Sequence, residues 1–394
     1  AWQAKHAALA AIQYAAEYAE DIEHVNQMSQ LVLAHVDHAH PRVQYIALYA
    51  LAHLGKYQAP HFQDGWHKTV MAVLLRKMDE PLDCVAEMTM VAFVAFAEVL
   101  DKSLMLGYAK GFMHRLVSRL ISSQNRGVQR QCVVSIGVVA AVIDEDFTQY
   151  YQDVMPILKQ IVIAMSGSER TGSALRSVAF ECMSVIGLAV GKDTFLPDAA
   201  GIVAEMMKTS CGADDEQREY ISLASQRICK CLKQEFAAFL PGFLPGIFMA
   251  MQMDSSEVSG KFWSTDADLR QKQNRADACK LLQRGAIANL SSRCGPTGVV
   301  NSKVRKVAKV RTDTFQQALQ SVHSLNIFCT EVEDAFFEYV PQAAEALLPF
   351  LASGEDTDML CDTVRSAAFQ AWASLIDCAC TGANVRGLNA DFPQ

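Results

Sequence analysis

The chain has 394 residues, of which 51% are apolar and 20% are charged, so it can bury a large core and does not have the composition of a disordered protein. A formal net charge of -8 at pH 7 argues against direct nucleic-acid binding as the main function and is compatible with basic protein partners. Uncharged apolar runs such as Val133 to Ile143 have about half of the roughly 20 residues that a membrane-spanning helix needs. We therefore expect no membrane insertion. The opening residues, AWQAKHAALAAIQ, are amphipathic and lack an initiator Met, which predicts a fragment of a longer protein without a signal peptide.

The cysteines point to a reducing compartment. Twelve cysteines would suggest disulfides in a small secreted protein, but this chain is large and most of its cysteines fall on helical patterns. No two of them have the C-x-x-C spacing of a zinc knuckle. The pattern predicts buried thiols that pack as small apolar side chains.

One apolar register returns along the chain about every 40 residues. It is clearest at Leu175 to Val190 (LRSVAFECMSVIGLAV) and at Val364 to Leu375 (VRSAAFQAWASL), where a basic residue precedes apolar pairs on one helical face. Weaker copies occur at Ala4 to Ala15, Val43 to Leu54 and Gln129 to Val139. This period is typical of HEAT or armadillo units, which are pairs of helices. We predict an all-α fold, an α-α superhelix (HEAT-repeat solenoid) of about seven helix pairs plus partial terminal repeats.

In chain order, each unit is predicted to contain a helix A, a short polar turn and a helix B. The A helices are expected at Ile22–Val36, Pro60–Met78, Lys102–Ile121, Phe147–Met165, Thr194–Thr209, from Glu235 onward, and Glu333–Ala352. The B helices are expected at Val43–Leu54, Cys84–Leu100, Val128–Ile143, Ala174–Val190, Gln217–Leu232, Thr314–Thr330 and Met359–Cys378. The turns carry Asp, Gly, Ser or Pro, where a helix stops. The residues from Cys380 onward are expected to begin an eighth unit.

A single unit cannot bury its own apolar face, so neighbouring units must stack over residues 1–394 as one solenoid. Such a stack has a long surface lined by the B helices instead of a closed pocket. We therefore expect functional side chains on the solvent side of the B helices.

The sixth repeat is expected to contain an insertion at 254–311. Apolar residues between Asp268 and Leu290 share one helical face and predict a short helix. The run from Arg293 to Arg311 has basic residues and no acidic one. It is either a mobile basic arm that contacts a partner or a solvated loop.

Motifs for catalysis and for metal binding are not apparent in the sequence. The stretch Gly187 to Lys192 (GLAVGK) is shorter than a phosphate loop, is followed by Asp193 and follows a predicted helix instead of a strand. His35, His38 and His40, crowded on a turn, are more typical of surface histidines than of a structural metal site, which would have four ligands at defined spacing. We expect no enzyme activity, no catalytic residue, no cofactor and no metal.

Several stretches resemble the central HEAT repeats of the importin beta (karyopherin beta) family, closest to its importin beta-3 or importin 5 branch. They are HPRVQY at His40 to Tyr45, FECMSVIGLAVGKDTF at Phe180 to Phe195, RIC at Arg227 to Cys229 with Glu235-Phe236, and FFEY at Phe336 to Tyr339. The resemblance implies a monomeric nuclear transport receptor that shuttles between cytoplasm and nucleus. It implies as partners cargo proteins with basic signals, the Ran GTPase and nucleoporins, with release of cargo by Ran-GTP.

The resemblance also implies which residues bind cargo. In this family, acidic and Asn side chains on the inner helices receive the Lys or Arg of cargo, and Glu98 and Glu181 occupy matching positions. The alternative for both is a solvated helix face. Relatives carry Asn near Tyr49 and Ala95, an acid near Ala141, and Trp near Ser225, so this groove is expected to be less acidic and to prefer different cargo.

A loop that contacts Ran or cargo in the family has its counterpart here in the insertion. The candidate contacts are Trp263 and a basic run of Lys303, Arg305, Lys306, Lys309 and Arg311. The alternative function that the sequence leaves open is a HEAT-repeat scaffold for a multiprotein complex unrelated to nuclear transport.

Overall fold

The computed structural model describes residues 2–167, 170–209, 216–251, 302–351 and 359–387. In these ranges the regular structure consists of α-helices and three short 3-10 helices, without any strand. The chain divides into two compact units, and the described part of the first ends at Val190. The second begins at Gly191. The predicted all-α HEAT fold is confirmed.

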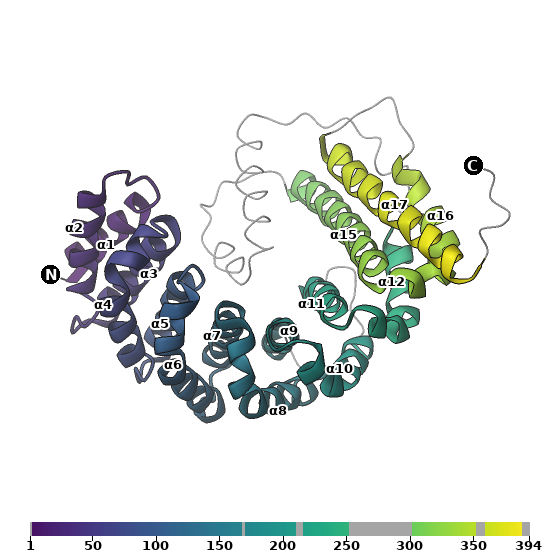
Figure 1. Cartoon of the computed structure of the whole chain (residues 1–394). Coiled ribbons are helices and arrows are strands. Elements are labelled where there is room, and N and C mark those ends of the chain that lie inside the picture. Colours follow the sequence, from purple (N-terminus) through teal and green to yellow (C-terminus); the bar gives the residue numbers. More distant parts are fainter. Residues whose placement is uncertain (1, 168–169, 210–215, 252–301, 352–358, 388–394) are drawn as a thin grey trace. The chain divides into compact units, whose positions relative to one another are not determined.

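The first unit consists of alternating A and B helices (Figure 1). Its B helices are α1 (Trp2–Ala15), α3 (Pro41–Tyr57), α5 (Asp83–Ala97), α7 (Arg126–Ile143) and α9 (Arg170–Val190). Its A helices are α2 (Ile22–Leu33), α4 (His61–Lys77), α6 (Lys102–Ser122) and α8 (Thr148–Ala164), the last preceded by the 3-10 helix η1 (Asp144–Phe147). Figure 1 shows α5, α7 and α9 in one row, with α6 and α8 in the other.

The second unit continues the same alternation. Its A helices are α10 (Lys192–Met207), α12 (Leu240–Met251) and α16 (Val340–Leu351), the last two preceded by the 3-10 helices η2 (Lys233–Phe239) and η3 (Glu333–Tyr339). Its B helices are α11 (Glu216–Leu232), α15 (Ser302–Val332) and α17 (Met359–Val385).

Most helix boundaries agree with the sequence-based prediction within a few residues, but two differ. The helix α17 continues to Val385, so residues 380–385 belong to the seventh helix B and not to an eighth unit. The helix α15 begins at Ser302, well before Thr314, so the end of the predicted basic loop is helical. The helix predicted between Asp268 and Leu290 lies outside the described residues. The single solenoid over residues 1–394 and the insertion at 254–311 both stay predictions.

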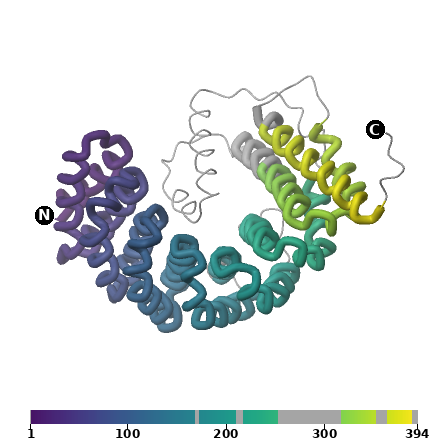
Figure 2. The backbone as a smooth tube through the Cα atoms, viewed as in Figure 1, coloured from purple at the N-terminus to yellow at the C-terminus, as the bar shows by residue number. Residues whose placement is uncertain are grey.

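Successive B helices pack closely against one another. In the first unit α1 contacts α3, α3 contacts α5, α5 contacts α7 and α7 contacts α9, and the trace in Figure 2 shows this order. In α5 every residue from Met88 to Ala97 is buried. The approach of α3 to α5 uses Gly55, where a β-carbon would lie 3.2 Å from the carbonyl oxygen of Ala95. Small and β-branched side chains thus allow the B helices to form one continuous core layer.

Two apolar helical stretches, Arg126–Ala164 and Gly172–Val190, are long enough to cross a membrane. The first is two helices, because α7 ends at Ile143 and the chain reverses at Asp144, whose φ is 51°. In the second, 72% of the apolar window is buried inside the protein. Packing between neighbouring helices accounts for the apolar character of both.

Side chains from the first two turns of several B helices cap the helix A before them. Gln129 donates to the carbonyl oxygen of Ser123 at 2.9 Å, and the buried guanidinium of Arg176 donates to that of Val162 at 3.0 Å. Gln44 binds the turn before α3 through the carbonyl oxygen of His38 at 2.8 Å. These bonds satisfy carbonyl groups that a helix end leaves without partners. The basic residue that opens the repeated motif at Leu175 therefore has a structural role.

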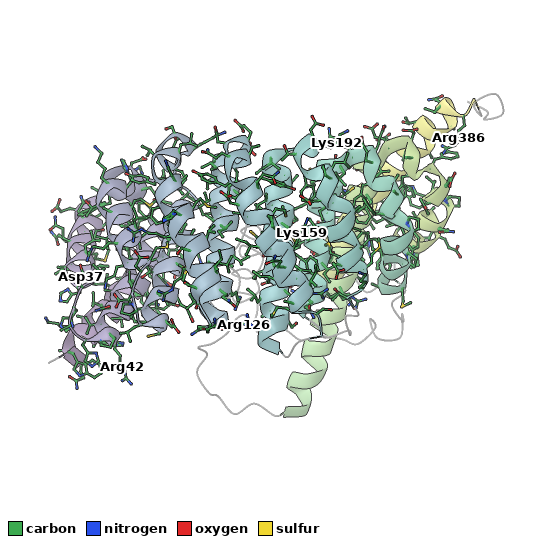
Figure 3. The ribbon with its side chains drawn as sticks, turned by 90° about the horizontal axis from the view of Figure 1, so that it is seen from below. Asp37, Arg42, Arg126, Lys159, Lys192 and Arg386 are labelled. Atoms are coloured by element: carbon green, nitrogen blue, oxygen red, sulfur yellow. The ribbon has the colours of Figure 1, made fainter. Side chains whose placement is uncertain are left out.

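A buried phenylalanine fixes the corner where a helix B leads into the next helix A. Phe147, Phe195, Phe236 and Phe336 are each 0% exposed and lie within the first turns after the corner. A positive φ occurs at the first residue of each of these corners, namely Asp144, Gly191, Lys233 and Glu333. Figure 3 shows Lys192, which follows the Gly191 corner, and Arg386 at the same edge of the second unit.

Candidate functional site

Each B helix from α3 to α9 has one stripe on which half-buried or exposed side chains recur, with buried ones between them. Counting from the equivalent positions Gln44, Ala86, Gln129 and Arg176, which lie in the first two turns of their helices, the same four offsets recur in each helix. We call this set the open B stripe, and it consists of Tyr45, Tyr49, His53 and Lys56 in α3, Glu87, Val91, Ala95 and Glu98 in α5, Arg130, Val134, Val138 and Ala141 in α7, and Ser177, Glu181, Val185 and Leu188 in α9. The spacing of three and four residues places each group on one helical face.

The α3 part of the stripe is aromatic. The ring centroids of Tyr45 and Tyr49 are 6.5 Å apart, and those of Tyr49 and His53 are 4.8 Å apart with nearly perpendicular planes. The Lys56 ammonium lies 4.8 Å from the ring centroid of Tyr57, in the range of a cation-π contact. This ladder was not predicted from the sequence, although the i, i+4 spacing of Tyr45, Tyr49 and His53 was visible there.

The imidazole of His53 is held in place by Gln13 of α1, with 3.3 Å between the two side-chain nitrogens. Burial lowers the pKa of His53 below its ordinary value, and the nearby charge of Lys56 lowers it further. The ring is therefore neutral at pH 7, and it completes an aromatic surface instead of adding a charge to it.

The centre of the stripe is apolar. On α5, Val91 and Ala95 are 5% and 7% exposed, and on α7 Val138 is 5% exposed. A β-carbon added at Gly127 would collide with the carboxylate of Glu87, so this carboxylate reaches across from α5 to the first turn of α7. Figure 3 shows Arg42 and Arg126, in the first turns of α3 and α7, at the same edge of the first unit. The middle of the stripe, which we call the apolar floor, thus consists of small side chains such as Val91, Ala95 and Val138.

Both predicted cargo-binding carboxylates lie on the open B stripe, but the structure does not bring them together. Glu98 follows the last turn of α5 and is half-buried, with its Oε1 atom enclosed. Glu181 lies in the middle of α9 and is also half-buried. The helix α7 lies between α5 and α9 and has only Val134, Val138 and Ala141 at the three offsets beyond Arg130. The two acids are therefore separate anchors at the borders of an apolar floor.

Three of the four positions at which the sequence differs from its relatives lie on the open B stripe. Tyr49, Ala95 and Ala141 are on it; Tyr49 is half-buried and Ala141 exposed, whereas Ala95 is buried, so the expected loss of polar groups reaches solvent at Tyr49 and Ala141. Ser225 is not, because it lies on α11, outside the helices that form the stripe; it is buried, and its hydroxyl donates to the carbonyl oxygen of Ser222 at 2.7 Å. The acidic Glu87 at the first offset of α5 was not predicted.

The loop candidates are only partly described. Trp263 lies outside the described residues. The backbone of Lys303, Arg305, Lys306, Lys309 and Arg311 belongs to the first turns of α15, and their side chains lie outside the described set. Their contact with a partner stays a prediction.

The histidine turn before α3 is organised by an ion pair. Arg76 donates to both carboxylate oxygens of Asp37, at 3.0 and 2.6 Å, and Lys77 lies 3.3 Å from the same group. The hydrogen bond from Arg76 is the main reason why the pKa of Asp37 lies below its ordinary value. In the part of the chain that the structure describes, no three His, Cys, Asp or Glu side chains are placed to hold a metal ion.

A cavity of about 330 Å³ lies between α2 and α4 in the first unit. Its apolar wall is formed by Ile22, Val25, Phe62 and Trp66. The indole nitrogen of Trp66 donates to Asn26 Oδ1 at 3.0 Å, which fixes the ring at the edge of the cavity. The cavity is on the A side of the unit and is separate from the open B stripe.

The fold and this surface define a class, the HEAT-repeat proteins that present a row of parallel B helices. No protein-family model matches the chain. Its relatives are nevertheless importins. Importin subunit beta-3 of Saccharomyces cerevisiae is 27% identical over 254 residues, which are 63% of this chain and 23% of that protein. The probable importin-5 homolog of Dictyostelium discoideum is 30% identical over 160 residues, which are 40% of this chain and 15% of that protein.

Solved structures of Kap121p have the same fold. The karyopherin Kap121p bound to the SUMO protease Ulp1p has a TM-score of 0.74 at 21% identity, over 97% of this chain and 33% of that chain. Kap121p bound to Nup53p has a TM-score of 0.73 at 22% identity, over 98% of this chain and 34% of that chain. The predicted resemblance to the importin beta family is confirmed. The chain spans less than a quarter of the length of these two importins and about a third of Kap121p.

Proposed function

We propose that this chain is the part of a nuclear transport receptor that binds cargo, and that the open B stripe of the first unit is the binding surface. Support comes from importin relatives that match the chain over up to 63% of its length, and from the solved structures of Kap121p bound to Ulp1p and to Nup53p. The main observation is that two half-buried carboxylates, Glu98 and Glu181, border an apolar floor on one row of parallel helices. The described side chains of this surface do not form a set typical of an enzyme active site, and we assign the surface a role in binding cargo.

The chemistry of the surface selects basic cargo segments. A half-buried carboxylate gains more from a Lys or Arg partner than a fully solvated one, because the pair is less screened by water. The apolar floor between the two acids favours aliphatic or small side chains between the basic residues of the cargo.

The separation of the acids sets the spacing of the cargo residues. Glu98 and Glu181 are two helix spacings apart, roughly 16 to 20 Å at the usual 8 to 10 Å between packed helices. They also differ by about seven residues along the helix direction, roughly 10 Å at 1.5 Å per residue, so their separation is roughly 19 to 23 Å. An extended segment covers about 3.3 Å per residue, so basic residues about six to seven positions apart would reach both carboxylates.

A pull-down with a Lys-rich import signal tests this proposal. The double variant Glu98→Arg with Glu181→Arg should lose binding at low salt, because both anchors become repulsive. The matched control is Glu23→Arg with Asp153→Arg, which makes the same change in net charge on the A helices α2 and α8 and should leave binding intact. Equal binding by both double variants would count against the proposed surface.

Release of cargo by Ran-GTP is the second part of the proposal. In the full-length protein, Ran-GTP should compete with the import signal. The alternative function is a HEAT-repeat scaffold, which shares the stacked helix pairs and would be indifferent to Ran-GTP. Passage between cytoplasm and nucleus and contact with nucleoporins follow from the receptor role, and a scaffold would not require either.

A further inference from the structure

Arg130 is the charged residue that α7 contributes to the open B stripe. It is half-buried, and its Nε atom is enclosed without a hydrogen-bond partner. In the part of the chain that the structure describes, its guanidinium has neither a hydrogen bond nor an ion pair. The two terminal nitrogens are not among the enclosed atoms, so they are accessible from solvent. The stripe thus contains a cation without an internal partner, on the helix between the two that carry Glu98 and Glu181.

Neighbouring arginines of the first unit are satisfied within the protein. Arg126 donates to Oε1 of Gln129 at 2.7 Å, and Arg176 donates to the carbonyl oxygen of Val162 at 3.0 Å. An enclosed donor without a partner lowers stability, because it has lost its water and gained no hydrogen bond. A methionine at position 130 would keep the packing of the aliphatic stem and avoid that cost. A residue that lowers stability without a contact inside the protein is typical of a binding position.

The most obvious internal partner for Arg130 is Glu87 of α5. The Glu87 carboxylate reaches α7 at Gly127, which is three residues before Arg130 and therefore on the same helical face. The two side chains nevertheless form no ion pair among the described residues. Glu87 repels any second negative charge that comes close, so the position suits a single carboxylate better than a polyanion.

We propose that Arg130 binds an acidic side chain of the cargo, so that segments recognised by this surface carry an Asp or Glu at a fixed distance from a basic residue. This inference rests on the proposed function and adds a third contact to the two carboxylate anchors. A guanidinium pairs with a carboxylate through two parallel N–H···O bonds, which specify orientation as well as position. The charge of the cargo segment therefore matters by position and not only by its sum.

The seam between α7 and α9 sets the spacing between the acid and the nearest basic residue of the cargo. A β-carbon added at Gly137 would lie 3.6 Å from the sulfur of Cys182, so these two residues lie opposite each other. Arg130 is seven residues before Gly137 in α7. Glu181 is one residue before Cys182 in α9, so the two charged residues differ by about six residues along the helix direction, roughly 9 Å. With one helix spacing of roughly 8 to 10 Å between them, they are roughly 12 to 13 Å apart, which an extended segment covers in about four residues.

Fluorescence anisotropy with a labelled Lys-rich import signal tests this inference on the whole chain. One Asp is placed in turn at each non-lysine position of the peptide, and each Asp peptide is compared with the Asn peptide of the same position. We expect Asp to weaken binding at most positions, because carboxylates border the stripe. At one position, about four residues from a lysine that binding requires, Asp should strengthen binding several-fold. In Arg130→Gln this gain should disappear, while lysine-dependent binding should remain.

The matched control is Arg126→Gln, which removes the same charge from the first turn of α7 outside the stripe and should keep the gain. Asp peptides that never bind better than their Asn counterparts would overturn the inference and leave the proposed function intact. A gain that survives in Arg130→Gln would overturn it as well. If no Lys-rich peptide binds, the proposed function fails, and the inference fails with it.

A second measurement does not depend on cargo. Arg130→Met removes the donor without a partner and keeps an apolar stem, so it should raise the thermal midpoint. The control is Arg76→Met, which removes the hydrogen bonds of 3.0 and 2.6 Å to Asp37 and should lower the midpoint. A lower midpoint for Arg130→Met would show that this guanidinium has a stabilising partner within the folded protein, with Glu87 as the first to test, and would contradict the inference.

Discussion

The ring of Phe337, in η3, packs directly onto the backbone of α17 at Gly382. A β-carbon added at Gly382 would collide with the β-carbon, Cγ and Cδ2 of this ring. The Arg386 guanidinium lies 4.4 Å from the ring centroid. The Phe337 ring is therefore held between Gly382 and Arg386, and moving it would cost free energy.

We predict that Gly382→Ala destabilises the second unit by about 1 to 3 kcal/mol, the usual cost of an overpacked contact. The control is Gly201→Ala in α10, where nothing lies within 4 Å of the added carbon. That change should stabilise the protein by up to about 1 kcal/mol, because Ala is the better helix former. Urea unfolding of both variants checks this prediction, and shifts of the same sign would contradict it.

The corner between α11 and η2 is strained. Lys233 has a φ of 53°, a conformation that only glycine adopts at no cost, and its side chain is exposed. We predict that Lys233→Gly stabilises the protein by about 1 kcal/mol, because relief of strain exceeds the added entropy of the unfolded chain.

The matched control for this change is Lys230→Gly, three residues earlier on the exposed side of α11. Glycine there interrupts a regular helix and should destabilise by about 1 kcal/mol. Thermal unfolding distinguishes the two variants by opposite shifts of the midpoint. A lower midpoint for Lys233→Gly would show that the corner is not strained.

The corners illustrate what could be predicted from the sequence. The helix period placed nearly every helix, because an apolar stripe with 3.6-residue periodicity is a strong signal. The positive φ angles at the corners could not be predicted, because Lys233 and Glu333 have no local sequence feature that favours this conformation. The start of α15 was missed for a different reason, since the segment before Thr314 was interpreted by its basic charge, although Val304, Val307 and Val310 recur there every three residues.

We predict that stability falls as the pH decreases from about 7.5 to 5.5, in part because of His53. Burial lowers the pKa of this residue in the folded protein, whereas the unfolded chain binds a proton near the usual value of about 6.5. Protonation therefore favours the unfolded state, and the loss begins as the pH passes the unfolded pKa.

In the His53→Gln variant, the free energy of unfolding should fall less over the same pH interval than in the unchanged protein, since Gln cannot take up a proton. The difference should be roughly one kcal/mol or less. The exposed His61→Gln is the control and should leave the slope as it is in the unchanged protein. Urea unfolding at a series of pH values measures both. An unchanged slope in His53→Gln would place the pH dependence elsewhere, with the half-buried His323 as the next residue to test, since burial lowers its pKa as well.

The candidate site could be predicted only in part. The resemblance placed Glu98 and Glu181 on B helices, and both are on the open B stripe. It did not predict the aromatic ladder of Tyr45, Tyr49 and His53, because relatives carry Asn near Tyr49 and because the contacts of the ladder depend on how α1 and α3 pack. Ser225 was assigned to the same groove, but its burial follows from helix packing that the sequence does not specify.

The described cysteines should separate into two kinetic classes with a thiol reagent such as Ellman's at pH 8. Cys84 and Cys380 are exposed and should react within seconds to minutes. Burial raises the pKa of Cys132 to about 12 and that of Cys231 to about 11, so little thiolate is present and these residues should react many-fold more slowly. Cys84→Ser and Cys380→Ser should each remove one fast equivalent. Denaturant should make every thiol fast, and a fast Cys132 in the native protein would mean that the packing of α5 against α7 opens readily.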